Sequence, residues 1–121
     1  MVGHYHDVSR ELSAAGRELR SRIPEVYATY AESSKAAMTG DGELDAVTKE
    51  LLAMVIGVAS HCDGCYISHA RKLARLGASE QQVAEALGVA IFMMGGPGTV
   101  YGARAFEAFR EFRPAQEQQV Q

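Results

Sequence analysis

Cys62 and Cys65 are the only cysteines of the 121-residue chain, and His69 follows Cys65 by four positions. If a helix begins at Cys62, the two thiols and the imidazole lie on one face of it, because residues three or four apart are neighbours on a helix. The positive end of the helix dipole favours a thiolate there, and a protonated imidazole favours it further. A thiolate with a second thiol within reach can attack an oxidant or a disulfide and then be resolved internally. The spacing therefore predicts redox chemistry at a dithiol.

Glu50 is the carboxylate that we expect beside His69. If the helices on either side of the turn at 60–61 form an antiparallel hairpin, Glu50 lies about 16 Å from that turn and His69 about 12 Å, at 1.5 Å per residue. The two side chains then face each other within about one helical turn and can pass protons through a water. The alternative is a helix-surface carboxylate that pairs with Lys49 or Lys72.

Two other interpretations of the cysteine pair stay open. Cys62, Cys65 and His69, with His61 as a fourth ligand, have the residue types that tetrahedral zinc prefers. Structural zinc sites usually take a second ligand pair from about 12 or more residues away, and the sequence offers no such pair. The cysteines could also be two small buried residues at a helix start. We favour the redox pair, and we expect no metal and no other cofactor.

The composition excludes several classes of protein. Charged residues make up 22% of the chain and hydrophobic residues 47%, which is ordinary for a globular protein. A net charge of −3 makes a poor general ligand for nucleic acid or for an anionic membrane surface. No apolar run approaches the ~20 residues that span a bilayer, and the first ten residues carry no apolar signal segment. We expect a cytoplasmic protein with no nucleic-acid or membrane partner.

The elements that must position the cysteines are helices. Nineteen alanines, three prolines and no tryptophan favour an all-α fold, and no run of alternating polar and apolar residues predicts a strand. Pro24 suits the first turn of a helix, Asp45 an N-cap, Gly77 a left-handed C-cap, and Ser79 with Gln82 a capping box. The predicted helices cover 8–22, 24–40, 45–60, 62–77, 79–94 and 99–112, with the glycine-rich segment 95–98 breaking or bending the path before the last one.

The third predicted helix is apolar almost all round from Leu51 onward, so we expect it to be the central buried helix. A six-helix monomer would not cover it and the fifth helix completely, which predicts a homo-oligomer. We expect one domain over 1–113 and a frayed tail over 114–121, because the tail has almost nothing to bury.

The motif resembles that of a known family. Glu50, eleven intervening residues and then Cys62-x-x-Cys65-x-x-x-His69 resemble the motif of the alkylhydroperoxidase D-like proteins, which belong to the carboxymuconolactone decarboxylase superfamily. The resemblance covers about 44–112 and includes the helix junction Leu76-Gly77-Ala78-Ser79. The motif and its spacing are fairly specific, whereas the helical background is not.

The resemblance implies an all-α fold that assembles as trimers or hexamers, with active sites at or near subunit contacts. It implies a thiol-dependent peroxidase that reduces a hydroperoxide, or a reductase that acts on the disulfide of a partner protein, with an external thiol as reductant. By position, Cys62 and Cys65 would be the redox pair, His69 would activate a thiol, and Glu50 would be the proton-relay carboxylate.

The sequence departs from the family's pattern at one place. The peroxidases of this family have a second relay histidine immediately before the second cysteine, where this chain has Gly64. His61 is a candidate substitute, and Tyr66 is a candidate to line the pocket. Decarboxylases of the superfamily generally lack the C-x-x-C pair, so an acid–base enzyme that uses Glu50 and His69 is the less favoured alternative.

Overall fold

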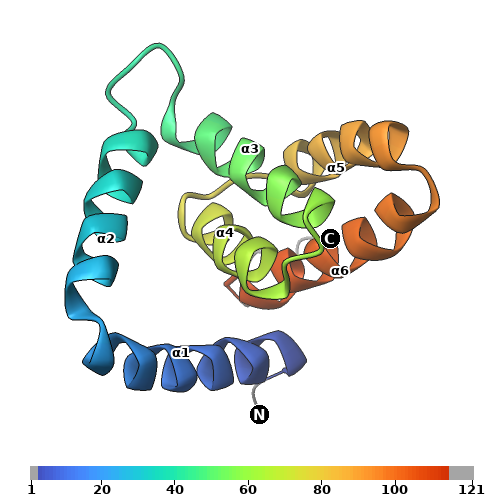
Figure 1. Cartoon of the computed structure of the whole chain (residues 1–121). Helices are drawn as coiled ribbons and strands as arrows, with labels where there is room; N and C mark the ends of the chain where they lie inside the picture. Colours follow the sequence, from blue (N-terminus) through green and yellow to red (C-terminus); the bar gives the residue numbers. More distant parts are fainter. Residues whose placement is uncertain (1–2, 115–121) are drawn as a thin grey trace.

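Six helices follow one another along residues 3–114, the part of the chain that the computed structural model describes (Figure 1). The all-α prediction with six helices is confirmed. The predicted tail lies, apart from Pro114, outside the described residues. The helices are α1 (His4–Arg22), α2 (Pro24–Met38), α3 (Ala46–Ala59), α4 (Asp63–Arg75), α5 (Glu80–Met94) and α6 (Gly96–Phe112).

The arrangement separates two parts of the chain. Helices α3 to α6 pack together, with the most extensive contacts between α3 and α4, between α5 and α6, and between α4 and α6. Helices α1 and α2 form an angled arm along one side of this group (Figure 1). The core lies within the four-helix part, where the largest fully buried side chains are Met54, Val58, Tyr66, Leu73, Val83 and Phe109.

Local capping explains three of the helix boundaries. The Asp45 carboxylate accepts a hydrogen bond of 2.8 Å from the backbone N–H of Thr48 and begins α3. Ser79 and Gln82 form the predicted capping box at the start of α5. Gly77 has a φ of +79°, the left-handed conformation that a residue without Cβ adopts freely. These three predictions from the sequence are confirmed.

Helix α1 begins at His4, four residues before the predicted start, because its N-terminal capping group comes from α6. The Glu111 carboxylate accepts hydrogen bonds from the backbone N–H groups of Tyr5 (3.1 Å) and His6 (2.7 Å) and contacts the His6 ring. Burial alone would raise the pKa of Glu111, but the hydrogen bonds from His6 and Tyr5 outweigh it and hold that pKa below its usual value. The contact ties the first turn of the chain to its last described helix.

Helix α6 begins at Gly96, three residues earlier than predicted. Gly95, with a φ of +74°, makes the turn alone. Pro97 then lies in the first turn of α6, where its missing N–H costs nothing. The glycine-rich segment is therefore a one-residue turn followed by helix, not a longer break.

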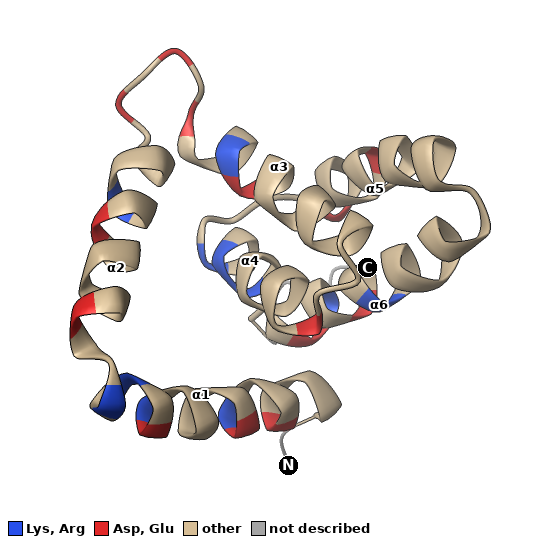
Figure 2. Cartoon of the chain, viewed as in Figure 1, with Lys and Arg blue, Asp and Glu red and all other residues tan. Residues whose placement is uncertain are grey.

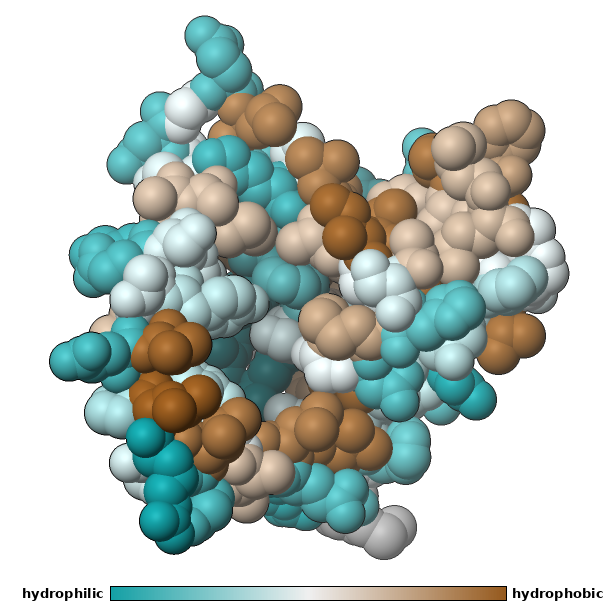
Figure 3. All heavy atoms as spheres, in the orientation of Figure 1, coloured by the Kyte–Doolittle hydropathy of each residue, from teal (hydrophilic) through white to brown (hydrophobic). Residues whose placement is uncertain are grey.

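Helix α3 is apolar on two faces, and only one of them is buried in the single chain. Met54 and Val58 are fully buried on one face, but Leu52 and Ile56 on the other face are 51% and 64% exposed. Exposed apolar side chains continue on α5 at Val89, Phe92 and Met93. Figure 3 shows brown, apolar surface over α3 and over the α1–α2 junction. The sequence predicted that a single chain would not cover this helix completely, and no other described helix covers its second face.

Within residues 3–114, no helix has both the length and the apolar character needed to cross a membrane.

Candidate active site

Cys62 occupies the N-cap position of α4, at the end of the short turn that follows α3. Its sulfur accepts a hydrogen bond of 3.2 Å from the backbone N–H of Cys65, as a serine or aspartate oxygen would at an N-cap. Its carbonyl accepts the N–H groups of Cys65 and Tyr66, which closes the first turn. The sulfur of Cys62 therefore lies where the free N–H groups of a helix point.

Cys62 and Cys65 form a disulfide, with their Cα atoms 5.2 Å apart. Cys65 is exposed and Cys62 is half-buried. An incoming group therefore meets Cys65 more easily, while Cys62 receives the hydrogen bond at the helix start. The two cysteines differ in access and in electrostatic surroundings, although they belong to one bond.

Gly57 allows α3 to pack closely against the start of α4. A Cβ at this position would lie 2.9 Å from the backbone nitrogen of Tyr66 and 3.0 Å from the Cβ of Cys65. Both distances are shorter than ordinary contacts, and the backbone nitrogen cannot turn away as a side chain can. Because Gly57 has no side chain, the first turn of α4, which carries the disulfide, can pack directly against α3 at this position.

The structure brings Glu50 and His69 together across the hairpin of α3 and α4. The Nδ1 atom of His69 lies 2.5 Å from Oε2 of Glu50, within hydrogen-bonding distance. The Glu50 side chain is 9% exposed and that of His69 is 22% exposed, so the pair is largely shielded from water. A buried carboxylate is tolerated when it has such a partner. His69 is oriented by Glu50 through one ring nitrogen, which leaves the other free for chemistry.

Lys49, considered from the sequence as a partner for Glu50, contacts a different group. Its ammonium donates to the backbone carbonyls of Ala37 (3.0 Å) and Thr39 (2.7 Å) at the end of α2. It therefore caps unpaired carbonyl groups there and connects α2 to α3. Glu50 therefore contacts His69, as the hairpin geometry predicted, and the alternative of a surface carboxylate paired with a lysine is wrong.

The two auxiliary candidates differ in burial, since His61 is exposed and Tyr66 is buried, and neither lines the cavity at the disulfide. His61 has a φ of +53°, which is uncommon for a residue with a side chain, and its ring stacks on Tyr101 with centroids 4.3 Å apart. Tyr66 is buried, and its hydroxyl donates a hydrogen bond of 2.8 Å to Asp63. Burial, together with this hydrogen bond, raises the pKa of Tyr66. Both residues support the turn that carries the cysteines.

A cavity of about 460 Å³ opens onto the disulfide, and its second wall comes from α2. Cys62, Cys65 and His69 line it from one side. Figure 3 shows the molecule hollowed between α2 and the α3–α4 hairpin. The α2 wall was not predicted from the sequence, although its residues have helical spacing that could have indicated a common face: Tyr30, Ser33, Ser34, Ala37 and Met38.

Metal-ligating side chains do not gather in threes or more anywhere in the described part of the chain. In the disulfide, both sulfurs are engaged with each other and neither is a thiolate, the form that ligates zinc. The chemistry of this arrangement is that of a dithiol–disulfide pair with a histidine and a carboxylate beside it.

The fold and the site define an all-α protein with a C-x-x-C disulfide at a helix start. Comparison with known proteins gives the family: the profile of the carboxymuconolactone decarboxylase family matches residues 24–108, and the chain belongs to this family. It is similar to the crystal structure of a carboxymuconolactone decarboxylase family protein from Legionella pneumophila in its apo form. The TM-score is 0.86 at 36% identity, covering 91% of this chain and 97% of that one.

Two curated relatives are also similar, and both are uncharacterized. One is a protein of Cupriavidus necator, 35% identical over 103 residues, which are 85% of this chain and 87% of the relative. The other is uncharacterized protein 4 in the cox locus of Paracoccus denitrificans, 28% identical over 102 residues, which are 74% of this chain and 92% of the relative.

Proposed function

We propose that this protein is a thiol-dependent oxidoreductase of the alkylhydroperoxidase D-like type. The observation that carries the proposal is the Cys62–Cys65 disulfide at the start of α4, in a cavity that His69 also lines. The Glu50–His69 pair supports it, because an oriented histidine beside a thiol is what proton removal from that thiol requires. The substrate class is a hydroperoxide or the disulfide of a partner protein.

The oxidative half of the cycle begins with the reduced pair. His69, oriented by Glu50, takes the proton of Cys65, and the thiolate attacks the terminal oxygen of the hydroperoxide. The O–O bond breaks, Cys65 becomes a sulfenic acid, and the leaving alkoxide takes the proton from His69. The thiol of Cys62 then attacks the sulfenic sulfur, which forms the disulfide and releases water. One hydroperoxide becomes one alcohol and one water, and the two thiols supply the two electrons.

The reductive half uses the difference between the two cysteines. A donor thiolate attacks the exposed Cys65 sulfur, and Cys62 leaves as a thiolate at the helix N-cap, where the N–H of Cys65 points at it. A thiolate stabilised in this way is a good leaving group. A second donor thiol then releases Cys65 from the mixed disulfide. Two donor thiols become one donor disulfide.

Variants of the cysteine pair test the proposal. Cys62→Ser and Cys65→Ser are each expected to abolish turnover of a hydroperoxide with a dithiol reductant, because a one-thiol site cannot resolve itself. The measurement is the consumption of an organic hydroperoxide under multiple turnover, with thiol titration before and after mild oxidation. Arg22→Gln, a surface change on α1 with 77% of the side chain exposed, is the matched control and is expected to keep full activity.

The Glu50–His69 pair supports a second candidate, an acid–base enzyme of the decarboxylase type. In the dithiol mechanism, His69→Ala slows the reaction at neutral pH, and the defect shrinks as pH rises, because hydroxide then removes the thiol proton. Glu50→Gln acts in the same direction more weakly, through His69. If both cysteine variants keep full activity while Glu50→Gln and His69→Ala lose all of it, the acid–base function replaces the dithiol one.

A further inference from the structure

A second cavity, of about 360 Å³, lies beside the disulfide cavity, between α1 and α4. The two cavities share Gly64, Ser68 and Lys72 as lining residues, so they adjoin along one face of α4. A molecule that extends a few ångströms beyond the disulfide along α4 therefore enters this second cavity. We call it the basic cavity.

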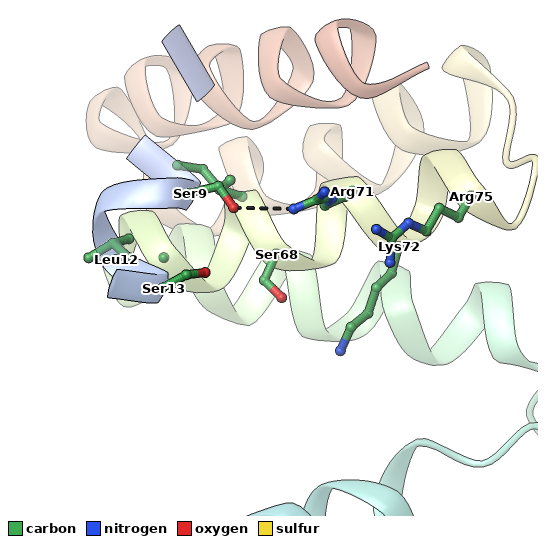
Figure 4. Close-up of a pocket in the computed structure, with 9 residues that line it drawn as sticks. Ser9, Leu12, Ser13, Ser68, Arg71, Lys72 and Arg75 are labelled. Carbon is green, nitrogen blue, oxygen red and sulfur yellow. Dashed lines mark hydrogen bonds between the residues drawn. The ribbon is translucent and has the colours of Figure 1, made fainter. Parts of the chain in front are cut away.

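The basic cavity has the lining that an anion needs. It offers three hydroxyl groups and three positively charged side chains, and none of its lining residues is a carboxylate. Figure 4 shows Arg71 joined to Ser9 between α1 and α4, whereas Lys72 extends from α4 on the side away from α1. The polar lining residues are Ser9, Ser13, Ser68, Arg71, Lys72 and Arg75.

The three cations form one cluster by helical spacing. Arg71, Lys72 and Arg75 are one, three and four positions apart, which places them on adjoining parts of one face of α4. Figure 2 shows this blue cluster on the half of α4 away from the disulfide. The negative end of the helix dipole favours cations in a last turn, but it accounts neither for the serines on α1 nor for the hollow between the helices. The chain as a whole has a net charge of −3, so the cluster is a positively charged surface on an acidic protein.

No carboxylate among residues 3–114 forms an ion pair with Arg71, Lys72 or Arg75. The Arg71 guanidinium contacts the Ser9 hydroxyl at 3.4 Å and lies over the ring of Phe112, 5.3 Å from the ring centroid. These two contacts hold the guanidinium in place without neutralising its charge. A positioned, unneutralised guanidinium beside hydroxyl donors is a recognition element for carboxylates and phosphates.

We propose that the basic cavity binds a carboxylate or phosphate group of the thiol reductant that reopens the Cys62–Cys65 disulfide. The inference rests on the proposed function and names the class of its electron donor: a thiol that carries anionic groups a few bonds from the sulfur. With the anion between α1 and α4, the donor thiolate lies over the exposed Cys65. It attacks that sulfur, Cys62 leaves as a thiolate, and a second donor thiol completes the two-electron reduction as above.

Two thiols of different charge test the proposal on the intact oxidised protein. The rate of disulfide reduction is measured with mercaptosuccinate, which carries two carboxylates, and with neutral 2-mercaptoethanol. Each rate is divided by the rate of the same thiol with 4,4′-dithiodipyridine, a neutral disulfide that differs from both thiols, which removes the difference in intrinsic reactivity. We expect a normalised preference for mercaptosuccinate of about tenfold at low ionic strength, because a cationic cleft concentrates anions. At 1 M salt, where charges are screened beyond about 3 Å, the preference disappears.

Variants locate the effect. Arg75→Gln is expected to reduce the normalised preference about threefold, and the double change Lys72→Gln with Arg75→Gln to remove most of it. Arg22→Gln removes the same charge from the surface of α1 and is expected to keep the preference. Equal normalised rates for the two thiols would overturn the proposal. A loss of the preference in Arg22→Gln as large as the loss in Arg75→Gln would also overturn it.

A binding measurement separates failure of this inference from failure of the proposed function. Titration of the isotope-labelled protein with succinate, and separately with inorganic phosphate, is followed by the amide resonances of residues 9–13 and 68–75. Shifts confined to these segments support the basic cavity even if no thiol reduces the disulfide, a result that would refute the proposed function alone. The stronger of the two responses identifies carboxylate or phosphate as the preferred group. No shift with either anion would overturn the inference while leaving the dithiol chemistry standing.

Discussion

Gly57→Ala is expected to destabilise the protein, although the same change in most helix interiors stabilises it. Alanine in place of glycine usually gains about 1 kcal/mol in a helix. At this position, however, the new methyl group would lie 2.9 Å from the backbone nitrogen of Tyr66 and 3.0 Å from the Cβ of Cys65. Relief requires α4 to move away from α3, and overpacking of this kind typically costs about 1–3 kcal/mol. The net loss is therefore about 0–2 kcal/mol.

Gly16→Ala is the matched control, because a Cβ at Gly16 on α1 would meet nothing within 4 Å. Gly16→Ala should gain the stability that alanine gives to a helix without a steric clash. The difference in stability between the two variants then equals the overpacking cost, about 1–3 kcal/mol. For a chain of this length that corresponds to a difference in Tm of roughly 4–12 °C.

Thermal and urea unfolding of the wild type and both variants measure this difference, with the disulfide intact in every sample. Movement of α4 also weakens the hydrogen bond of 3.2 Å from the Cys65 N–H to the Cys62 sulfur, so Gly57→Ala should change the rate of disulfide reduction while Gly16→Ala does not. Equal stabilisation of both variants would refute the close approach of α3 and α4 at the disulfide.

Three further outcomes are expected. The pKa of Glu111 is lower in the folded protein than its value of about 4.3 in the unfolded chain. Its stabilising contribution is therefore complete above the unfolded pKa and is lost as pH falls through the folded pKa. Glu111→Gln should thus make stability, measured by urea unfolding, fall less steeply below about pH 5. Elemental analysis of purified protein should give no stoichiometric zinc, and one zinc per chain whose removal unfolds the protein would favour a zinc-stabilised module. Light scattering at micromolar concentration should give a homo-oligomer, because the exposed apolar faces of α3 and α5 need a cover, and a monomer would contradict this. The family resemblance implies that this oligomer is a trimer or hexamer.

The parts of the site that are local in sequence could be predicted. Cys62, Cys65 and His69 are related by helical periodicity, and Glu50 is related to them by one hairpin whose two arms can be measured in residues. The start of α5 could be predicted for the same reason, since Ser79 and Gln82 make the capping box within one turn. The catalytic roles of these residues stay predictions until the variants are measured.

The parts that depend on distant segments could not be predicted. Glu111 caps α1 from more than a hundred residues away, so the start of that helix has no local signal. The same holds for the basic cavity, where the cations of α4 are visible as a pattern but the Ser9 and Ser13 hydroxyls reach them only in the folded chain. Composition likewise indicates that α3 is apolar on several faces, but not which of these faces the neighbouring helices cover.

Helix α2 forms a wall of the disulfide cavity yet has no buried residue of its own. The free energy needed to detach such a helix is small, because little apolar surface returns to water. Its backbone amides should therefore exchange with solvent deuterium through local unfolding, at denaturant concentrations that leave α3 to α6 intact. Detachment of α2 removes the second wall of the cavity that Cys62 and Cys65 line, so low concentrations of urea should accelerate attack on the disulfide through this cavity before the core melts. The width of this cavity at the reactive bond is thus set by the stability of one weakly packed helix rather than by the global stability of the fold.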